Sequence, residues 1–155
     1  MSRPDPIDRI DRDMTQIDFY VLKPGTGGDR FAFTCRLVEH IRASRDFRIL
    51  IHCPDQPQAR ALDRLLWTHR DDSFLPHGLV GETDPELTPI LISTDGKPAQ
   101  EDQVLINLAT DVPEFFSRFE RLCEPLDQDP SILSAGRKRY TYYRECGYAL
   151  KYHEV

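Results

Sequence analysis

The chain has 155 residues, and 20 Lys and Arg against 26 Asp and Glu give a formal net charge of −6. With 39% hydrophobic and 30% charged residues, it has enough apolar side chains for a core and too much charge for an integral membrane protein. It contains no apolar run of roughly 18 residues and no signal-peptide pattern near its start, so we expect a soluble, cytoplasmic protein without membrane attachment.

The four cysteines stand far apart, and no C-x-x-C pair occurs. This spacing favours neither a zinc site nor a disulfide framework. We therefore interpret them as small buried apolar side chains: Cys35, Cys53, Cys123 and Cys146.

The charge is distributed unevenly along the chain. Residues 132–155 carry five basic and two acidic side chains, a net +3, which leaves −9 for the rest. Five of the six tyrosines lie in the same basic stretch. A cationic surface with amphipathic aromatic groups suits an acidic partner, whereas the overall negative charge disfavours strong direct binding to DNA.

The first 13 residues carry seven charged side chains and two prolines without periodicity, which predicts a disordered extension. The fold is predicted to be one domain covering residues 14–155. Within it, short apolar runs rich in β-branched and aromatic residues predict strands buried in a sheet. These runs cover residues 17–22, 48–53, 89–93 and 103–108.

The first two predicted helices have clear starting signals. Residues 29–44 have apolar side chains at helical spacing, and Asp29 is a plausible N-cap. After the second strand, Asp55 and Gln58 resemble a capping box, with Pro57 in the first turn.

Two further helices are predicted at residues 113–123 and 131–146, the second ending at Gly147. The resulting order of elements is β-α-β-α-β-β-α-α. Such an order is typical of an α/β fold with a mainly parallel central sheet and helices on both faces.

The glycines Gly25, Gly27 and Gly28 lie between the first predicted strand and helix, where dinucleotide-binding proteins hold a pyrophosphate. The spacing does not fit, because a G-x-G-x-x-G pattern would place its third glycine at Arg30, and no Gly-Lys-Ser/Thr follows. A plain turn is therefore favoured. A nucleotide-binding α/β enzyme that uses this loop remains the alternative hypothesis.

The five histidines form no i,i+4 pair and have no cysteine at metal-ligand spacing. No G-x-S-x-G or other nucleophile signature is present. The sequence thus indicates no catalytic residue, no metal and no cofactor.

Two segments are typical of contact surfaces. The first joins Trp67, near a helix end, to a loop containing Phe74, Leu75 and Pro76. From residue type alone, burial in the core is the more common role of such a Trp or Phe.

The second segment lies in the last predicted helix. Arg137, Tyr140 and Arg144 are three and four residues apart and share one helix face. An ordinary solvated helix surface explains this pattern equally well.

Residues 62–82 (LDRLLWTHRDDSFLPHGLVGE) and 137–148 (RKRYTYYRECGY) closely resemble the chi (χ) subunit of the bacterial DNA polymerase III holoenzyme. The likeness covers about residues 14–148. It implies a non-catalytic, Rossmann-like adaptor that joins the clamp loader, through the psi (ψ) subunit, to the acidic C-terminal tail of single-stranded DNA-binding protein.

The resemblance also implies roles for individual residues. Trp67, Arg137 and Tyr140 match residues of the tail-binding pocket, and Arg144 belongs to the same motif. On this basis the last Phe of the tail is expected to be buried against both Trp67 and Tyr140. Phe74 matches the aromatic residue at the ψ-binding surface, with Leu75 and Pro76 beside it.

The chain departs from the family pattern at one position of the pocket. The best-known example has a Lys one turn before the Arg, where this chain has Leu133. That contact is either missing or replaced by Lys138 or Arg139. Where no ψ exists, the surface at Phe74 is expected to serve another partner, such as a DNA helicase.

Overall fold

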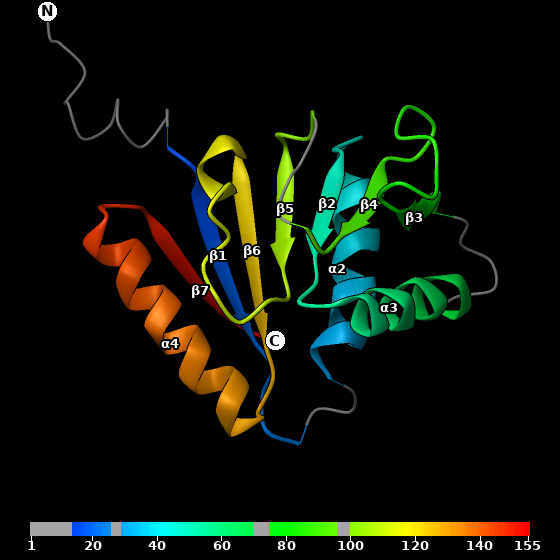
Figure 1. Ribbon diagram of the computed structural model, residues 1–155. Coiled ribbons are helices and arrows are strands. Elements are labelled where there is room, and N and C mark those ends of the chain that lie inside the picture. The colour runs from blue at the N-terminus through cyan, green and yellow to red at the C-terminus, as the bar shows by residue number, and fades with distance from the viewer. Residues whose placement is uncertain (1–13, 26–28, 70–74, 96–99) are drawn as a thin grey trace, which may run out of the picture.

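The computed structural model describes residues 14–25, 29–69, 75–95 and 100–155. Within these residues, one sheet has the strand order β3-β4-β2-β5-β6-β1-β7, and every neighbouring pair is parallel (Figure 1). The predicted α/β fold with a parallel sheet is thus confirmed. The strands are β1 (Gln16–Val21), β2 (Ile49–His52), β3 (His77–Leu79), β4 (Ile90–Ser93), β5 (Val104–Asn107), β6 (Arg121–Leu126) and β7 (Leu150–Glu154).

Three α-helices, α2 (Arg30–Ser44), α3 (Gln56–Thr68) and α4 (Pro130–Glu145), are present in the described part of the chain. The predicted caps are confirmed: the Asp29 side chain accepts hydrogen bonds from the first-turn amides of α2, and Asp55 accepts one from the Gln58 amide. After α4, Gly147 has φ +89°, which favours glycine and ends the helix there.

The helices cover opposite faces of the sheet. Ile49 and Ile51 of β2 point into the core under α2 and α3, whereas Leu50 between them points into the core under α4. In Figure 1, α4 lies on the side of β7 and β1, and α3 lies at the β3 edge. Surfaces on α3 and α4 are therefore separated by the sheet.

One predicted helix is wrong. Residues 113–123 form a short 3-10 helix η1 (Phe116–Arg118) and then enter β6, which lies between β5 and β1. The predicted helical face fails because Leu122 is buried as part of a strand that is parallel to both of its neighbours. Strands β3 and β7 were also not anticipated.

The expectation for the cysteines holds at three of four positions. Cys35, Cys53 and Cys123 are buried, and burial raises the pKa of each thiol to about 12. Cys146 is exposed, because it follows the last turn of α4 and lies outside the core.

Candidate functional site

The three residues predicted to share a face of α4 do lie together. The guanidinium carbon of Arg144 lies 5.9 Å from the centre of the Tyr140 ring. Tyr140 itself packs edge-on against Phe19 of β1, with 5.2 Å between ring centres. The aromatic ring is thus held against the sheet, and the exposed Arg137 lies one turn before it on the same helix face.

Beside Arg137 and Tyr140 is a cavity of about 370 Å³ between α4 and the strands β1, β6 and β7, which we call the Arg137 cavity. Among the lining residues that the structure describes, Arg137 is the single charged one. The walls are formed by Phe19, Val21, Leu126, Gln128, Leu133, Gly136, Tyr140 and Tyr152. The arrangement offers an apolar hollow with one guanidinium at its rim, which suits a carboxylate attached to an apolar side chain.

Gly136 brings α4 close to β6 at the floor of this cavity. A Cβ atom at position 136 would lie 2.5 Å from Cδ1 and 2.7 Å from Cδ2 of Leu126. Since glycine inside a helix is costly, its presence here is explained by this close approach. The isolated glycine was a signal in the sequence that could have located the floor of the site.

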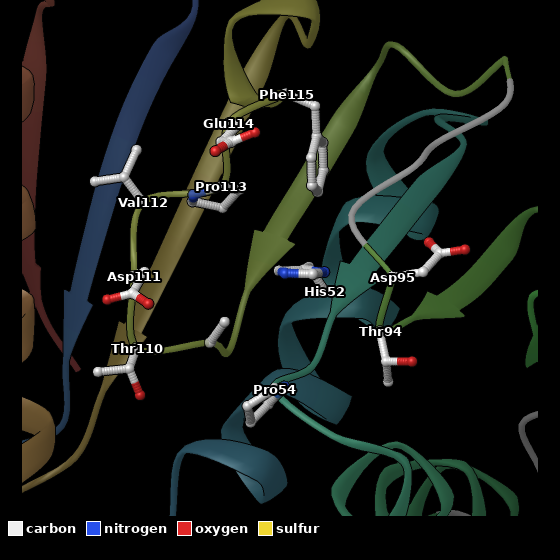
Figure 2. Close-up of a pocket in the computed structure, with 11 residues that line it drawn as sticks. His52, Pro54, Thr94, Asp95, Thr110, Asp111, Val112, Pro113, Glu114 and Phe115 are labelled. Atoms are coloured by element: carbon white, nitrogen blue, oxygen red, sulfur yellow. The ribbon is translucent and has the colours of Figure 1, made fainter.

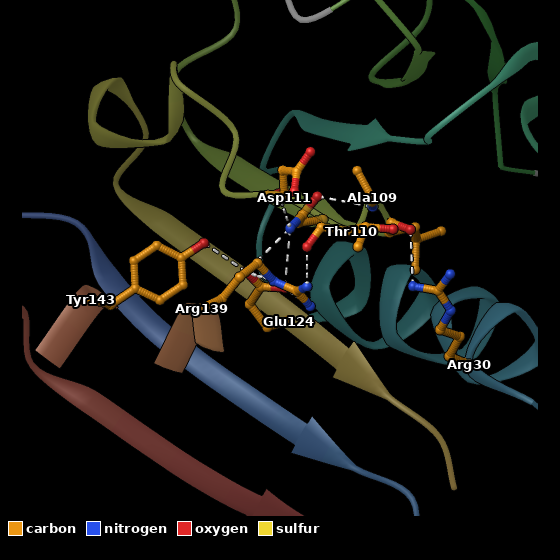
Figure 3. A network of polar contacts seen from close by, with 9 residues as sticks. Arg30, Ala109, Thr110, Asp111, Glu124, Arg139 and Tyr143 are labelled. Atoms are coloured by element: carbon orange, nitrogen blue, oxygen red, sulfur yellow. Dashed lines mark hydrogen bonds and ion pairs between the residues drawn. The ribbon is translucent and has the colours of Figure 1, made fainter. Parts of the chain in front are cut away.

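A buried polar network fixes α4 on the sheet (Figure 3). The carboxylate of Glu124 accepts hydrogen bonds from Arg139 Nε at 3.1 and 3.2 Å and from the Tyr143 hydroxyl at 2.7 Å. Asn107 Nδ2 donates to both carboxylate oxygens at 3.2 Å. Burial, together with the neighbouring Glu124 charge, raises the pKa of Tyr143 far above its ordinary value, so the phenol remains a donor.

This network corrects one candidate contact. Arg139 is only 3% exposed and its guanidinium is held by Glu124 and by the carbonyl oxygen of Thr110, so it cannot replace the missing family Lys. Lys138 is exposed but lines a different cavity, beside Thr110. Leu133 contributes an apolar wall instead of a charge.

The structure does not bring Trp67 to the Arg137 cavity. Trp67 is 54% exposed and its ring lies 4.5 Å from that of His77, at the start of β3. Strand β3 is five strands away from β1, roughly 24 Å by ordinary strand spacing, and α3 covers the opposite face from α4. One tail side chain therefore cannot contact both Trp67 and Tyr140, and the expected shared pocket is wrong.

Trp67 lies instead beside His77, next to the end of the predicted contact segment that contains Leu75 and Pro76. The His77 ring nitrogen Nδ1 lies 2.7 Å from the carbonyl oxygen of Leu75, which ties the end of the loop to β3. Leu75 and Pro76 are partly buried, and Phe74 lies outside the described residues. The exposure of Trp67 removes the core alternative for that residue.

A further cavity of about 400 Å³ opens at the carboxyl ends of β2, β4 and β5, where parallel α/β sheets commonly bind ligands (Figure 2). Carboxylates of Asp95, Asp111 and Glu114 line it, together with His52, and among the lining residues that the structure describes there is no Lys or Arg. Burial lowers the pKa of His52, which favours the neutral ring. The three described carboxylates oppose the phosphates that the nucleotide-binding alternative requires.

The described part of the loop at residues 25–28 does not support the nucleotide-binding alternative. Gly25 has φ +81°, and residues 26–28 lie outside the described part of the chain. Among the described residues, no group of three or more His, Cys, Asp or Glu side chains is placed to hold a metal ion. No helix in the described ranges is long and apolar enough to cross a membrane.

Comparison with known proteins gives a consistent result. The family model described as "DNA polymerase III chi subunit, HolC" matches residues 14–151. The DNA polymerase III subunit chi of Pseudomonas aeruginosa is 36% identical over 143 residues, which cover 92% of this chain and 98% of that protein. The chi subunit of Escherichia coli is 33% identical over 141 residues, covering 88% and 96%.

Among solved structures, the chain is similar to a structure titled "Mss116p DEAD-box helicase domain 2 bound to an RNA duplex", with a TM-score of 0.61 and 10% identity. The match covers 90% of this chain and 64% of that one. At this identity the likeness concerns the Rossmann-like α/β fold alone.

Proposed function

The chain belongs to the DNA polymerase III chi subunit family, whose members are accessory subunits of the replicase, and from this we propose that it connects the clamp loader to single-stranded DNA-binding protein. The connection uses two surfaces. The cavity at Arg137 binds the acidic C-terminal tail of single-stranded DNA-binding protein, and the surface at Phe74 binds ψ or its substitute.

The observation that carries the first assignment is the cavity in which Arg137 is the one charged side chain among the described lining residues. The tail's last Phe enters the apolar hollow beside Tyr140, and burying this side chain contributes roughly 1.5–3 kcal/mol. The terminal carboxylate bonds to the Arg137 guanidinium for about 1.5–3 kcal/mol more. Arg144 attracts the tail's aspartates through solvent and so aids association more than it holds the complex.

Binding also has to order a flexible tail, so an affinity in the region of micromolar is expected, weakening as salt rises. Arg137→Ala should reduce the affinity at least about tenfold, the equivalent of ~1.4 kcal/mol, because the carboxylate loses its partner. Arg137→Lys should restore only part of it, since an ammonium lacks the planar pair of donors. The measurement is calorimetric titration with the tail peptide and with a copy lacking the final Phe.

The matched control is Arg60→Ala, because Arg60 is an exposed arginine on α3, on the other face of the sheet. It should bind the tail peptide like the unmodified protein. If Arg137→Ala also binds normally, or if the shortened peptide binds as well as the full one, the tail occupies another site.

For the second surface, we propose that Trp67, Leu75 and Pro76 join Phe74 in contacting ψ or, where ψ is absent, a DNA helicase. The exposed Trp67 ring beside His77 supports this grouping, because large exposed aromatic side chains commonly anchor interfaces.

Phe74→Ala and Trp67→Ala should each abolish recovery of that partner by the purified full-length chain while tail affinity stays within twofold. Helix α3, which carries Trp67, and helix α4, which carries Arg137, cover opposite faces of the sheet, so loss at one surface should not reach the other. If Phe74→Ala is unfolded by circular dichroism, Phe74 is a core residue and the Trp67 variant decides the assignment.

A further inference from the structure

A second cavity with basic groups lies on the other face of the sheet from the Arg137 site. It has a volume of about 460 Å³ and lies between α2 and the strands β6, β1 and β7. Its apolar floor includes Phe33 and Leu37 of α2 together with Phe47. We call it the α2 groove.

Basic side chains surround this floor. Arg36 and His40 come from α2, Arg121 from β6 and His153 from β7, and no Asp or Glu is found among the lining residues in the described ranges. This is unusual for a chain with a net charge of −6. The guanidinium carbon of Arg36 lies 5.6 Å from the centre of the Phe33 ring, so positive charge and apolar surface are adjacent.

Two of these basic side chains, Arg121 and His153, are held in place by contacts with the sheet. The buried carboxylate of Asp18 accepts a hydrogen bond from Arg121 Nε at 3.0 Å and lies 2.9 Å from His153 Nε2. Tyr20 stacks on the His153 ring with 4.7 Å between ring centres, and its hydroxyl bonds to Arg121. One carboxylate thus orients both side chains and offsets part of the positive charge of Arg121, while Arg36 and His40 are exposed at the rim.

We propose that the α2 groove is a docking site for an internal acidic segment of a partner protein, in which carboxylates flank one large apolar side chain. The apolar side chain rests on Phe33, Leu37 and Phe47, and the carboxylates meet Arg36 and the Arg121–His153 pair. Charge complementarity selects an anionic partner. The exposed rim favours a segment of a larger protein over a small molecule, because small ligands are usually enclosed over most of their surface.

This site differs from the Arg137 cavity in what it requires. At Arg137 a single guanidinium meets a terminal carboxylate, whereas the α2 groove offers several basic groups and needs no chain end. Because the two sites lie on opposite faces of the sheet, both can be occupied at the same time.

The test is a titration of the full-length, ¹⁵N-labelled chain followed by amide chemical shifts. The probe is the peptide Asp-Glu-Phe-Glu-Asp with an acetyl group at its start and an amide at its end, so it has no terminal carboxylate. Amides of α2 and β7 should shift. The uncharged twin Asn-Gln-Phe-Gln-Asn should bind at least tenfold more weakly.

Variants of exposed side chains separate the two sites without disturbing the core. Arg36→Gln should weaken the blocked peptide at least threefold and Arg36→Glu at least tenfold, with an unchanged melting temperature and unchanged tail affinity. Arg137→Gln is the matched control, since it should weaken the tail peptide and leave the blocked peptide unaffected. Because each variant affects only one of the two peptides, a wrong assignment of the α2 groove can be distinguished from a wrong assignment of the tail site.

Four results would overturn the proposal: no shifts at millimolar peptide, shifts confined to α4, equal binding of the uncharged twin, or Arg36→Glu binding like the unmodified chain. A fifth is binding of free 3-phenylpropionate as tight as that of the peptide. That outcome would make the groove a small-molecule site.

Discussion

At the residue scale, Glu124 shows how strongly this fold depends on one buried charge. Its side chain has no solvent exposure, and donors from Arg139, Asn107 and Tyr143 converge on its two oxygens. A buried ion pair such as Glu124 with Arg139 adds little net stability compared with apolar packing. Removing one partner, however, leaves the other charge buried and uncompensated. Glu124 therefore holds α4 in position, together with Arg137, Tyr140 and Arg144 on the face of that helix.

Glu124→Gln should accordingly lower the free energy of unfolding by about 3–5 kcal/mol, because the new amide presents donors to Arg139 and Asn107, which are themselves donors. The measurement is urea denaturation followed by circular dichroism. The matched control is Glu82→Gln, which breaks the exposed pair with Arg60 and should cost at most about 1 kcal/mol. Similar losses for the two variants would show that the buried network does not carry this role.

At the scale of the element, the packing of α4 against β6 couples the position of the helix to the shape of the Arg137 cavity. Gly136 lets the helix approach Leu126, and Leu126 lines the same cavity. A side chain at position 136 has to displace the Leu126 methyl groups. Because Leu126 lines the Arg137 cavity, we expect the displaced methyl groups to take up space in it.

Gly136→Ala should therefore weaken binding of the tail peptide at least threefold, while the melting temperature changes by only a few degrees. The gain in helix propensity, up to about 1 kcal/mol, offsets part of the steric cost. Calorimetric titration and thermal melting measure the two effects. Ser134→Ala, at an exposed position of the same helix, is the control and should leave affinity unchanged. Normal tail binding by Gly136→Ala would show that Leu126 does not shape the binding site.

Local patterns predicted some elements and failed for others for identifiable reasons. β2 and β4 were found because continuous apolar runs are what a strand buried on both faces requires. The phenylalanines and Leu122 within residues 113–123 also fit helical spacing, and nothing local reveals that β6 is inserted between β5 and β1. β7 is a short edge strand, in which Leu150 and Tyr152 alternate with polar residues, so its apolar signal is weak.

At the scale of the whole molecule, strand order also decides which parts of the candidate site could be predicted, because local sequence patterns do not reveal it. Arg137, Tyr140 and Arg144 share a face by helical spacing alone, so the sequence was sufficient to group them. The walls from β1 and β7 depend on which strands lie beneath α4. The separation of Trp67 from Tyr140 likewise depends on strand order and on the face each helix covers. Those are properties of the assembled sheet, and the resemblance alone placed both residues in one pocket.

The core also links stability to alkaline pH. The thiols of Cys35, Cys53 and Cys123 have their pKa raised by burial from 9.0 to about 12. In the unfolded chain these thiols ionise above about pH 9, whereas in the folded chain they stay protonated up to about pH 12. Their contribution to stability is thus complete below pH 9 and is lost as pH rises from there towards 12.

As pH rises through this window, the ionisation of each thiol in the unfolded chain should lower the free energy of unfolding by up to about 1.4 kcal/mol per pH unit. The three thiols together should approach about 4 kcal/mol per pH unit. Against a typical total of roughly 5–15 kcal/mol, the domain should unfold well before pH 12. Urea denaturation at pH 8, 9, 10 and 10.5 under reducing conditions measures the slope. Cys53→Ala should make it shallower by about 1.4 kcal/mol per unit. An equal slope for Cys53→Ala and the unmodified protein would mean that the buried thiols ionise in the native state, and that the core under α2 and α3 admits solvent.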